Sequence, residues 1–190
     1  MFILDRSNCS SQAGWIDYDD GVIIQYNSLF AGKRGCEIQR VGTPSWNTGG
    51  NQRKRKQVGV SGMTLFLDYY FAGAAADYMM GFRRSTGLGH TTMSAIYNNG
   101  SGGLYMIENN TTPAPNAAPV NVGWINTKSV INADGTMSFY WISPEVTSWQ
   151  LIGTTSANDW IGADMYFSTN CYTNGPNFGS FIDNLLWTKP

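Results

Sequence analysis

Apolar and polar side chains alternate along much of this chain, with the two-residue period of a half-buried β-strand. Between Met63 and Phe71 every odd-numbered position is apolar or aromatic, whereas the even-numbered positions include Thr64 and Asp68. Residues 135–142 repeat the alternation directly after an Asn-Ala-Asp-Gly turn signal, which predicts a hairpin arm. Shorter strands are expected at 21–26, 36–41, 78–83, 93–97, 103–108, 121–125, 129–131, 149–154, 165–168 and 180–187.

Turn-forming residues separate almost all of these segments, as in residues 98–103 and 112–116, where Gly, Asn, Ser and Pro are concentrated. Residues 73–77 are the one place where the pattern allows a short helix. A series of short strands with turn signals between them is typical of a sandwich or jelly roll. We therefore predict one all-β domain over residues 1–190, built as a two-sheet antiparallel jelly-roll sandwich.

The last predicted strand carries apolar side chains on both faces. Strict alternation divides it into Phe181, Asp183, Leu185 and Trp187 on one face and Ile182, Asn184 and Leu186 on the other. A strand covered on both faces lies in the middle of a sheet. Because an unpaired buried polar group costs about 1–3 kcal/mol, we expect Asp183 and Asn184 to be hydrogen-bonded and to serve architecture rather than chemistry.

Four short motifs give the chain a family resemblance. They are Asp20-Gly21, the Gly32–Gly35 turn before Cys36, the Asp134–Thr136 hairpin and the closing Phe181–Leu185 segment. In this arrangement the sequence resembles the concanavalin A-like lectin/glucanase superfamily, especially its LamG-like members. The resemblance implies a jelly roll with a concave face that is often used for glycans, and calcium near an edge loop in many relatives. It implies no particular ligand, because fold does not fix function.

Charged residues make up only 13% of the chain and the net charge is -1. This balance gives no general electrostatic attraction to nucleic acid or to an anionic membrane surface. No segment approaches the roughly 18 uninterrupted apolar residues of a transmembrane helix, and the first residues lack the features of a secretory signal. We therefore expect no nucleic-acid partner, no membrane insertion and synthesis in a host cytoplasm.

The cysteines are Cys9, Cys36 and Cys171, an odd number without close Cys-x-x-Cys spacing. This spacing disfavours a disulfide framework and a zinc knuckle. One bridge is compatible with the count. Three buried free thiols are the simpler prediction.

Catalytic chemistry finds little support. The only glutamates are Glu37, Glu108 and Glu145, and the Glu-x-Asp-x-x-Glu arrangement of the superfamily's best-known glucanases does not occur. His90, the single histidine, has no acid or nucleophile beside it in the sequence. We predict no catalytic residues and therefore a protein that is not an enzyme.

Two charged segments are weak candidate sites. Asp17, Asp19 and Asp20 could offer oxygen ligands to Ca²⁺, yet they lack the ligand spacing of a dedicated loop, so no cofactor is expected and calcium is kept as an alternative. The basic run consists of Arg53, Lys54, Arg55 and Lys56. It could dock phosphate, an acidic glycan or an acidic subunit, but an exposed loop between strands is the simpler interpretation.

Three tryptophans lie in polar, turn-rich surroundings: Trp46, Trp149 and Trp160. Flat aromatic faces beside Asn and Asp suit sugar rings, and they suit protein interfaces equally well. The sequence leaves these two interpretations open.

Taken together, these patterns favour a non-enzymatic, lectin-like module that attaches to a glycan or to other subunits. We expect a homo-oligomer on a virion surface, as a capsid decoration or a tail or fibre component of a virus or phage, where multivalency strengthens weak contacts. The alternative is a glycan-active enzyme, or the carbohydrate-binding module of a polysaccharide-degrading system. Catalysis would require Glu37 and a second acid, Asp68 or Glu108, to meet in a cleft.

Overall fold

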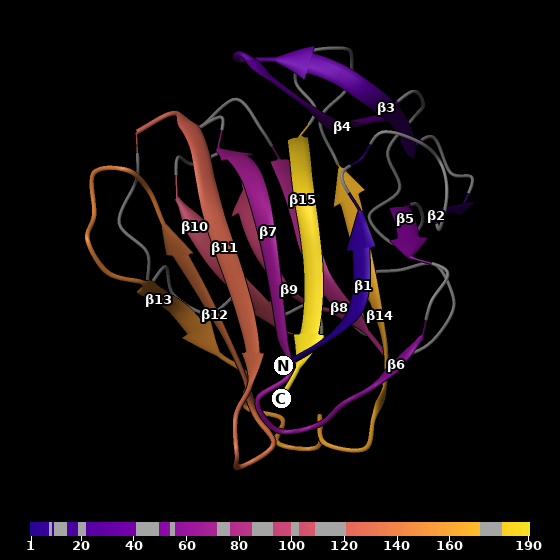
Figure 1. The fold of residues 1–190 in the computed structure, drawn as a ribbon, viewed down its shortest axis with the longest axis vertical. Coiled ribbons are helices and arrows are strands. Elements are labelled where there is room, and N and C mark those ends of the chain that lie inside the picture. Colours follow the sequence, from indigo (N-terminus) through magenta and orange to yellow (C-terminus); the bar gives the residue numbers. More distant parts are fainter. Residues whose placement is uncertain are drawn as a thin grey trace.

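Strands and the turns between them are the only regular structures in the described residues of the computed structural model, which are 1–7, 9, 15–18, 22–40, 50–53, 56–71, 77–84, 93–99, 103–108, 121–171 and 180–190. The strands form two antiparallel sheets that lie one behind the other (Figure 1). The predicted all-β sandwich is thereby confirmed. Within this described part of the chain, no helix has the length and apolar character needed to cross a membrane.

The larger sheet, nearer the viewer in Figure 1, has eight strands in the described residues. They are β1 (Phe2–Ser7), β3 (Val22–Phe30), β4 (Lys33–Arg40), β7 (Thr64–Phe71), β11 (Gly123–Ile131), β12 (Met137–Ile142), β13 (Gln150–Thr154) and β15 (Ser180–Lys189). Their order is β13-β12-β11-β7-β15-β4-β3, and β1 pairs with β15. The two chain ends therefore lie side by side, with Phe2 opposite Lys189.

The smaller sheet has seven strands in the same described part. They are β2 (Trp15–Tyr18), β5 (Gly50–Arg53), β6 (Gln57–Val58), β8 (Asp77–Arg83), β9 (Met93–Asn99), β10 (Leu104–Glu108) and β14 (Asp164–Cys171). Their order is β10-β9-β8-β14-β5-β2, and β6 pairs with β14.

The two-residue period of β7 decides which side chains enter the core. Its odd-numbered side chains, among them Leu65 and Leu67, are buried, and its even-numbered side chains are only partly covered. Between the sheets, Trp187 of β15 packs against Phe82 of β8 with ring centroids 5.3 Å apart. The interior is therefore apolar and aromatic, and the even-numbered positions of β7 remain for the outer face of the larger sheet.

The predicted strands occur near their expected positions, with two kinds of difference. The segments 121–125 and 129–131 belong to one strand, β11, because Asn126 and Lys128 occupy its outward positions and do not interrupt the ladder. Four further strands, β1, β2, β5 and β6, were not predicted. Of the expected short helix, residues 73–76 lie outside the described residues and Asp77 begins β8.

Strand β15 lies between β7 and β4, so the prediction of a central C-terminal strand is confirmed. The predicted division into two faces is wrong beyond Asp183. Asn184 adopts a positive φ of 50°, and the pairing with β7 shifts between Asp183 and Leu186. This β-bulge inserts one extra residue, so Leu185 and Trp187 both enter the core while Leu186 takes an outward position.

The loop after β13 is held by close backbone contacts. Trp160 N–H donates to the Gly135 carbonyl, and Gly162 N–H donates to the Gly59 carbonyl. A Cβ atom at Gly135 would lie 2.0 Å from the Asn158 oxygen, and one at Gly59 would lie 2.0 Å from the Trp160 oxygen. Only glycine permits this approach, which fixes the loop against the predicted β11–β12 hairpin.

Cys9 and Cys36 form a disulfide across 27 residues, with Cα atoms 5.0 Å apart and both residues fully buried. The prediction of three free thiols is therefore wrong. Cys36 lies in β4 and Cys9 follows β1, and both of these strands pair with β15. The spacing of the cysteines in the sequence does not show that these two strands share a partner. Cys171 ends β14, and its side chain lies outside the described part.

Substituting Gly135 with Ala should destabilise the fold by about 3 kcal/mol or more, because the new methyl group would meet the Asn158 backbone oxygen in addition to the strained φ of 84°. Gly32→Ala is the matched control. Its φ is 79° with no atom within 4 Å of the added Cβ, so it should cost about 1 kcal/mol. Urea unfolding measures both; equal losses would contradict the steric argument.

Thiol titration checks the disulfide. Of three cysteines, two are bridged, so one thiol per chain should react in denaturant without reductant and three after reduction. Peptide mapping should recover Cys9 and Cys36 in one linked pair. Three reactive thiols in the unreduced protein would show that the bridge is absent.

Candidate functional site

The outer face of the larger sheet presents side chains in rows that cross neighbouring strands. One row contains Trp124, Tyr70, Phe181 and Glu37; the next contains Ile142, Asn126, Asp68 and Asp183; the third contains Leu151, Tyr140, Lys128, Phe66, Leu186 and Arg6. Members of a row are direct cross-strand neighbours, and successive rows are two residues apart along each strand. Aromatic and polar side chains thus lie together on one surface.

A pocket of about 250 Å³ opens between the first two rows. It is lined by Lys33, Asp68, Trp124, Ile125, Asn126, Ile142, Ser143 and Pro144. Its volume is just below the range of about 300–1,000 Å³ common for small-molecule sites. The pocket therefore suits one small ring rather than a large cofactor.

Asp68 is the polar centre of the pocket. Asn126 Nδ2 donates to its Oδ1 at 2.5 Å, and Asn184 Nδ2 donates to its Oδ2 at 2.8 Å. The Lys33 ammonium donates to the same Oδ2. A carboxylate has about four acceptor positions, so these three donors fix the group and leave capacity for a hydroxyl of a ligand. The bulge at Asn184 supplies one of the donors, which ties the site to the fold of β15.

Asp183 lies directly opposite Asp68 on the neighbouring strand and is buried. Burial raises the pKa of Asp183, and the charge of Asp68 adds to the rise, while the backbone of Asn184 and the Lys33 ammonium act in the opposite direction. Lys33 Nζ lies 3.6 Å from Asp183 Oδ2. One lysine therefore faces two carboxylates. The expected hydrogen bonding is met for Asn184, which donates to Asp68, but only in part for Asp183, whose buried Oδ1 has no hydrogen-bond partner among the described residues.

Trp124 forms an aromatic wall of the pocket. Its ring meets Tyr70 edge-on with centroids 5.6 Å apart, and Lys33 Nζ lies 4.8 Å from its centroid. Tyr70 in turn packs edge-on against Phe181. These contacts hold the indole in a fixed orientation beside Asn126 and Asp68, so an apolar ring face and hydrogen-bonding groups converge on the same space.

Trp149 lies on this surface, over the third row. Lys128 Nζ is 4.6 Å from its ring centroid, and Phe66 packs beside it at 6.4 Å. Trp149 is half-buried, so part of its ring remains accessible. It thus lies on the surface that carries the pocket.

Trp160 does not present an exposed face, contrary to the expectation for this residue. It is 1% exposed and belongs to the hydrophobic core, and the Arg84 guanidinium, which forms an ion pair with Asp159, lies 4.3 Å from its ring centroid. The polar sequence around Trp160 reflects this ion pair and the surrounding turn rather than a binding surface. Trp46 lies outside the described residues.

The two charged segments of the sequence are only partly described. Arg53 ends β5, and Lys54 and Arg55 lie outside the described residues. Lys56 is exposed and pairs with Asp164, whose carboxylate raises the pKa of the lysine through a hydrogen bond.

For the weak calcium candidates, Asp17 lies in β2, while Asp19 and Asp20 are outside the described part. Across the described residues, no group of three or more His, Cys, Asp or Glu side chains is placed to hold a metal ion.

The glutamates proposed for the enzymatic alternative lie on different sheets. Glu37 is buried in the first row of the larger sheet, opposite Phe181. Glu108 ends β10 of the smaller sheet, where its carboxylate accepts hydrogen bonds from the backbone N–H groups of Ser156 and Ala157. Glu108 therefore anchors the loop after β13 and is not available for a cleft with Glu37.

The sequence analysis missed Lys33, Trp124 and Asn126 as site residues. Asn126 and Trp124 carry a weak signal, since both occupy outward positions of a strand that begins and ends its inward face with Ile125 and Ile131. Lys33 follows the Ala31-Gly32 turn between β3 and β4, and its approach to Asp68 depends on the strand order. No local pattern reveals that approach.

No protein-family model and no curated protein sequence matches this chain. Solved structures do match its fold. The globular domain of calreticulin from T. cruzi superposes with a TM-score of 0.61 at 9% identity, covering 98% of this chain and 88% of that one. The metal-free lectin I-B4 from Griffonia simplicifolia gives 0.58 at 8% identity, covering 92% and 98%.

Lectin UEA-II, solved in complex with galactose, gives a TM-score of 0.57 at 8% identity and covers 97% of each chain. At such low identities these likenesses concern the fold alone. The chain has the fold of these structures, a two-sheet antiparallel jelly-roll sandwich of the concanavalin A-like type, which is the fold that the sequence resemblance implied.

The raised pKa of Asp183 predicts a pH dependence of stability. A carboxyl with a raised folded-state pKa contributes stability below its unfolded pKa of about 3.9 and loses that contribution as the pH rises through the folded value. The free energy of unfolding of the native protein, minus that of Asp183→Asn, should therefore fall as the pH rises above about 4.

Urea unfolding of both proteins between about pH 3 and pH 7 measures this difference. Asp134→Asn is the control with the opposite sign, because hydrogen bonds from Thr136 lower the pKa of Asp134 and its contribution is lost as the pH falls. A difference for Asp183→Asn that stays constant over this range would show that the pKa of Asp183 is not raised by folding.

Proposed function

We propose that this protein is a non-enzymatic carbohydrate-binding module whose sugar site is the pocket between Trp124, Asp68 and Asn126. The single observation that carries the proposal is the junction of a fixed indole wall with a fixed carboxylate and amide in one open pocket. A pyranose ring presents an apolar C–H face and a rim of hydroxyls. It would stack on Trp124 while its hydroxyls bind Asp68, Asn126 and Ser143.

The charges in the pocket favour a ligand whose group next to Asp68 is neutral. Lys33 balances much of the charge of the acidic pair, and three donors already occupy Asp68. A hydroxyl can add a hydrogen bond to this carboxylate without bringing a further charge into the pocket. An anionic group of a ligand placed next to Asp68 and Asp183 would be repelled.

Attachment to a larger assembly remains part of the proposal. Phe2 and Ile3 on β1 are 65% and 60% exposed, and among the described residues β1 has a strand partner only on the side of β15. Exposed apolar side chains along a free strand edge favour pairing with a second copy. Display in a homo-oligomer would strengthen weak sugar binding by avidity.

The setting on a virion or phage surface stays a prediction. The Cys9–Cys36 bridge is compatible with it, since disulfides persist in oxidising surroundings such as particle surfaces.

Glycoside hydrolysis is the second candidate function. Asp68 and Asp183 are direct cross-strand neighbours, and such positions bring carboxyl groups near the separation of about 5–5.5 Å found in retaining glycosidases. The raised pKa of Asp183 would suit a general acid. Against this role, Asp183 is buried and the pocket lining includes Asp68 without it. Cleavage of a bound oligosaccharide on prolonged incubation would favour the enzyme.

A glycan array followed by calorimetric titration tests the binding function. Asn126→Ala and Trp124→Ala should each weaken binding of the selected oligosaccharide about tenfold or more, through the lost hydrogen bonds and the lost ring face. Asn126 is exposed, so its variant should fold normally. Thr154→Ala, on the same sheet but outside the pocket, is the control and should bind like the native protein.

A blank array at high protein concentration would reject the proposal. Native-like binding by both pocket variants would move the site away from this pocket.

A further inference from the structure

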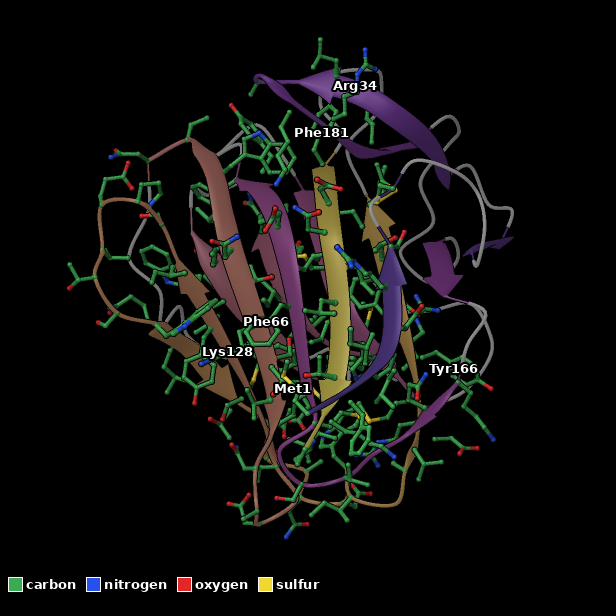
Figure 2. All side chains as sticks on the ribbon, viewed as in Figure 1. Met1, Arg34, Phe66, Lys128, Tyr166 and Phe181 are labelled. Carbon is green, nitrogen blue, oxygen red and sulfur yellow. A yellow bond between two sulfur atoms is a disulfide. The ribbon has the colours of Figure 1, made fainter. Side chains whose placement is uncertain are left out.

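The third row of the outer face lies immediately beside the pocket. Asn126 and Lys128 are two residues apart on β11 and point the same way, which places their Cα atoms about 6.6 Å apart along the strand. Figure 2 shows Lys128 and Phe66 next to one another on the viewer's side of β11 and β7, where they are cross-strand neighbours. A chain of sugar rings that starts in the pocket and follows the strands would pass over these residues.

Aromatic rings surround the Lys128 ammonium. It lies 4.6 Å from the centroid of Trp149 and 4.7 Å from that of Tyr140. Phe66 packs against Trp149 on the other side of the lysine stem. These ring contacts hold the ammonium at the surface in one place. Ring faces for stacking and a positioned cation therefore occur together here. In the pocket, the ring face of Trp124 lies beside a carboxylate, Asp68.

Lys128 differs from three other cations of the described residues in having no carboxylate partner among those residues. Lys33 pairs with Asp68, Lys56 with Asp164, and Arg84 with Asp159. In the described part of the chain, no carboxylate pairs with Lys128, and burial lowers its pKa.

The third row carries a second cation, Arg6, and no acidic residue. An anionic group of a ligand would find an oriented cation here, with no carboxylate of the same row to compete for it.

We propose that Trp149, Phe66 and Lys128 form a second subsite, which binds an acidic sugar next to the ring held in the pocket. The ring stacks on the exposed part of Trp149, and its carboxylate or sulfate group pairs with the Lys128 ammonium. This inference rests on the proposed carbohydrate-binding function. It adds that the ligand is an oligosaccharide that carries an anionic group on the unit beside the neutral one.

The alternation of charge along the surface gives the two subsites different preferences. Asp68 and Asp183 disfavour an anion in the pocket, whereas Lys128 favours one in the next position. A polymer of alternating neutral and acidic units meets both conditions. A uniformly neutral polymer meets only the first.

The test uses matched ligands: a soluble oligosaccharide of alternating uronate and neutral units, the same oligosaccharide after reduction of its carboxyl groups, and the reduced form bearing sulfate. Calorimetric titration of the full chain should show about tenfold tighter binding of the uronate or the sulfated form than of the reduced form. Whichever of the two anionic ligands binds more tightly, the uronate or the sulfated form, identifies the anionic group that Lys128 prefers to bind.

Lys128→Met keeps the apolar stem between the rings and removes the charge. It should bind the reduced form like the native protein and lose the tenfold preference for the anionic forms. Lys56→Met, which removes a cation far along the sequence that already pairs with Asp164, is the control and should keep the preference.

The outcomes separate the two proposals. Equal binding of charged and reduced ligands by the native protein overturns the second subsite and leaves the proposed function standing. A preference retained by Lys128→Met overturns the role of Lys128, as does an equal loss of both ligands in that variant, which would make the lysine a packing element. Failure of the native protein to bind any array glycan rejects the proposed function itself.

Discussion

The burial of strand β15 between β7 and β4 is the constraint on which the rest of this structure depends. A central strand must present apolar side chains to the core, and Ile182, Leu185 and Trp187 do so. The bulge at Asn184 allows this, because it shifts the register by one residue after Asp183. The same shift leaves Asp183 on the outer face, opposite Asp68, and aims the Asn184 amide at the Asp68 carboxylate. Core packing and the candidate site thus share one local backbone irregularity.

Two carboxylates on adjacent central strands repel one another when both are charged, and neighbouring side chains offset this repulsion. Lys33 reaches both groups from the start of β4, and two asparagine amides bind the more exposed one. The charged form of Asp183 is disfavoured, since burial raises the pKa of this carboxyl. The result is a rigid polar centre with limited remaining acceptor capacity. Such an arrangement suits recognition of hydroxyl groups better than it suits proton transfer to a bond that both acids would have to reach.

The outer face combines two environments within three neighbouring rows of side chains. The pocket joins an indole wall to an acidic pair, and the next row joins an indole to a lysine without a carboxylate partner in the described residues. In both the pocket and the third row, aromatic contacts hold a charged or polar group in place. The jelly-roll sandwich provides this surface because the inward half of each strand supplies the core and the outward half is free to vary.

The sequence by itself determined the fold class, most strand positions, the hairpin at residues 132–136 and the central place of the last strand. Each of these follows from local alternation and turn chemistry, which act within a few residues. It also singled out Trp149, though without its partners. Trp160 was misjudged because its polar neighbour Asp159 pairs with Arg84, which is distant in the sequence, and the Cys9–Cys36 bridge was missed because its cysteines are likewise distant in the sequence.

Only the tertiary structure decided which side chains form the site. Lys33, Asp68, Asn126 and Asn184 come from four strands, and their meeting depends on strand order, on register and on the bulge in β15. Alternation gives each strand two faces without saying which strand lies beside it. A one-residue shift in register moves side chains to the opposite face, so the site could not be read from any single segment of the chain.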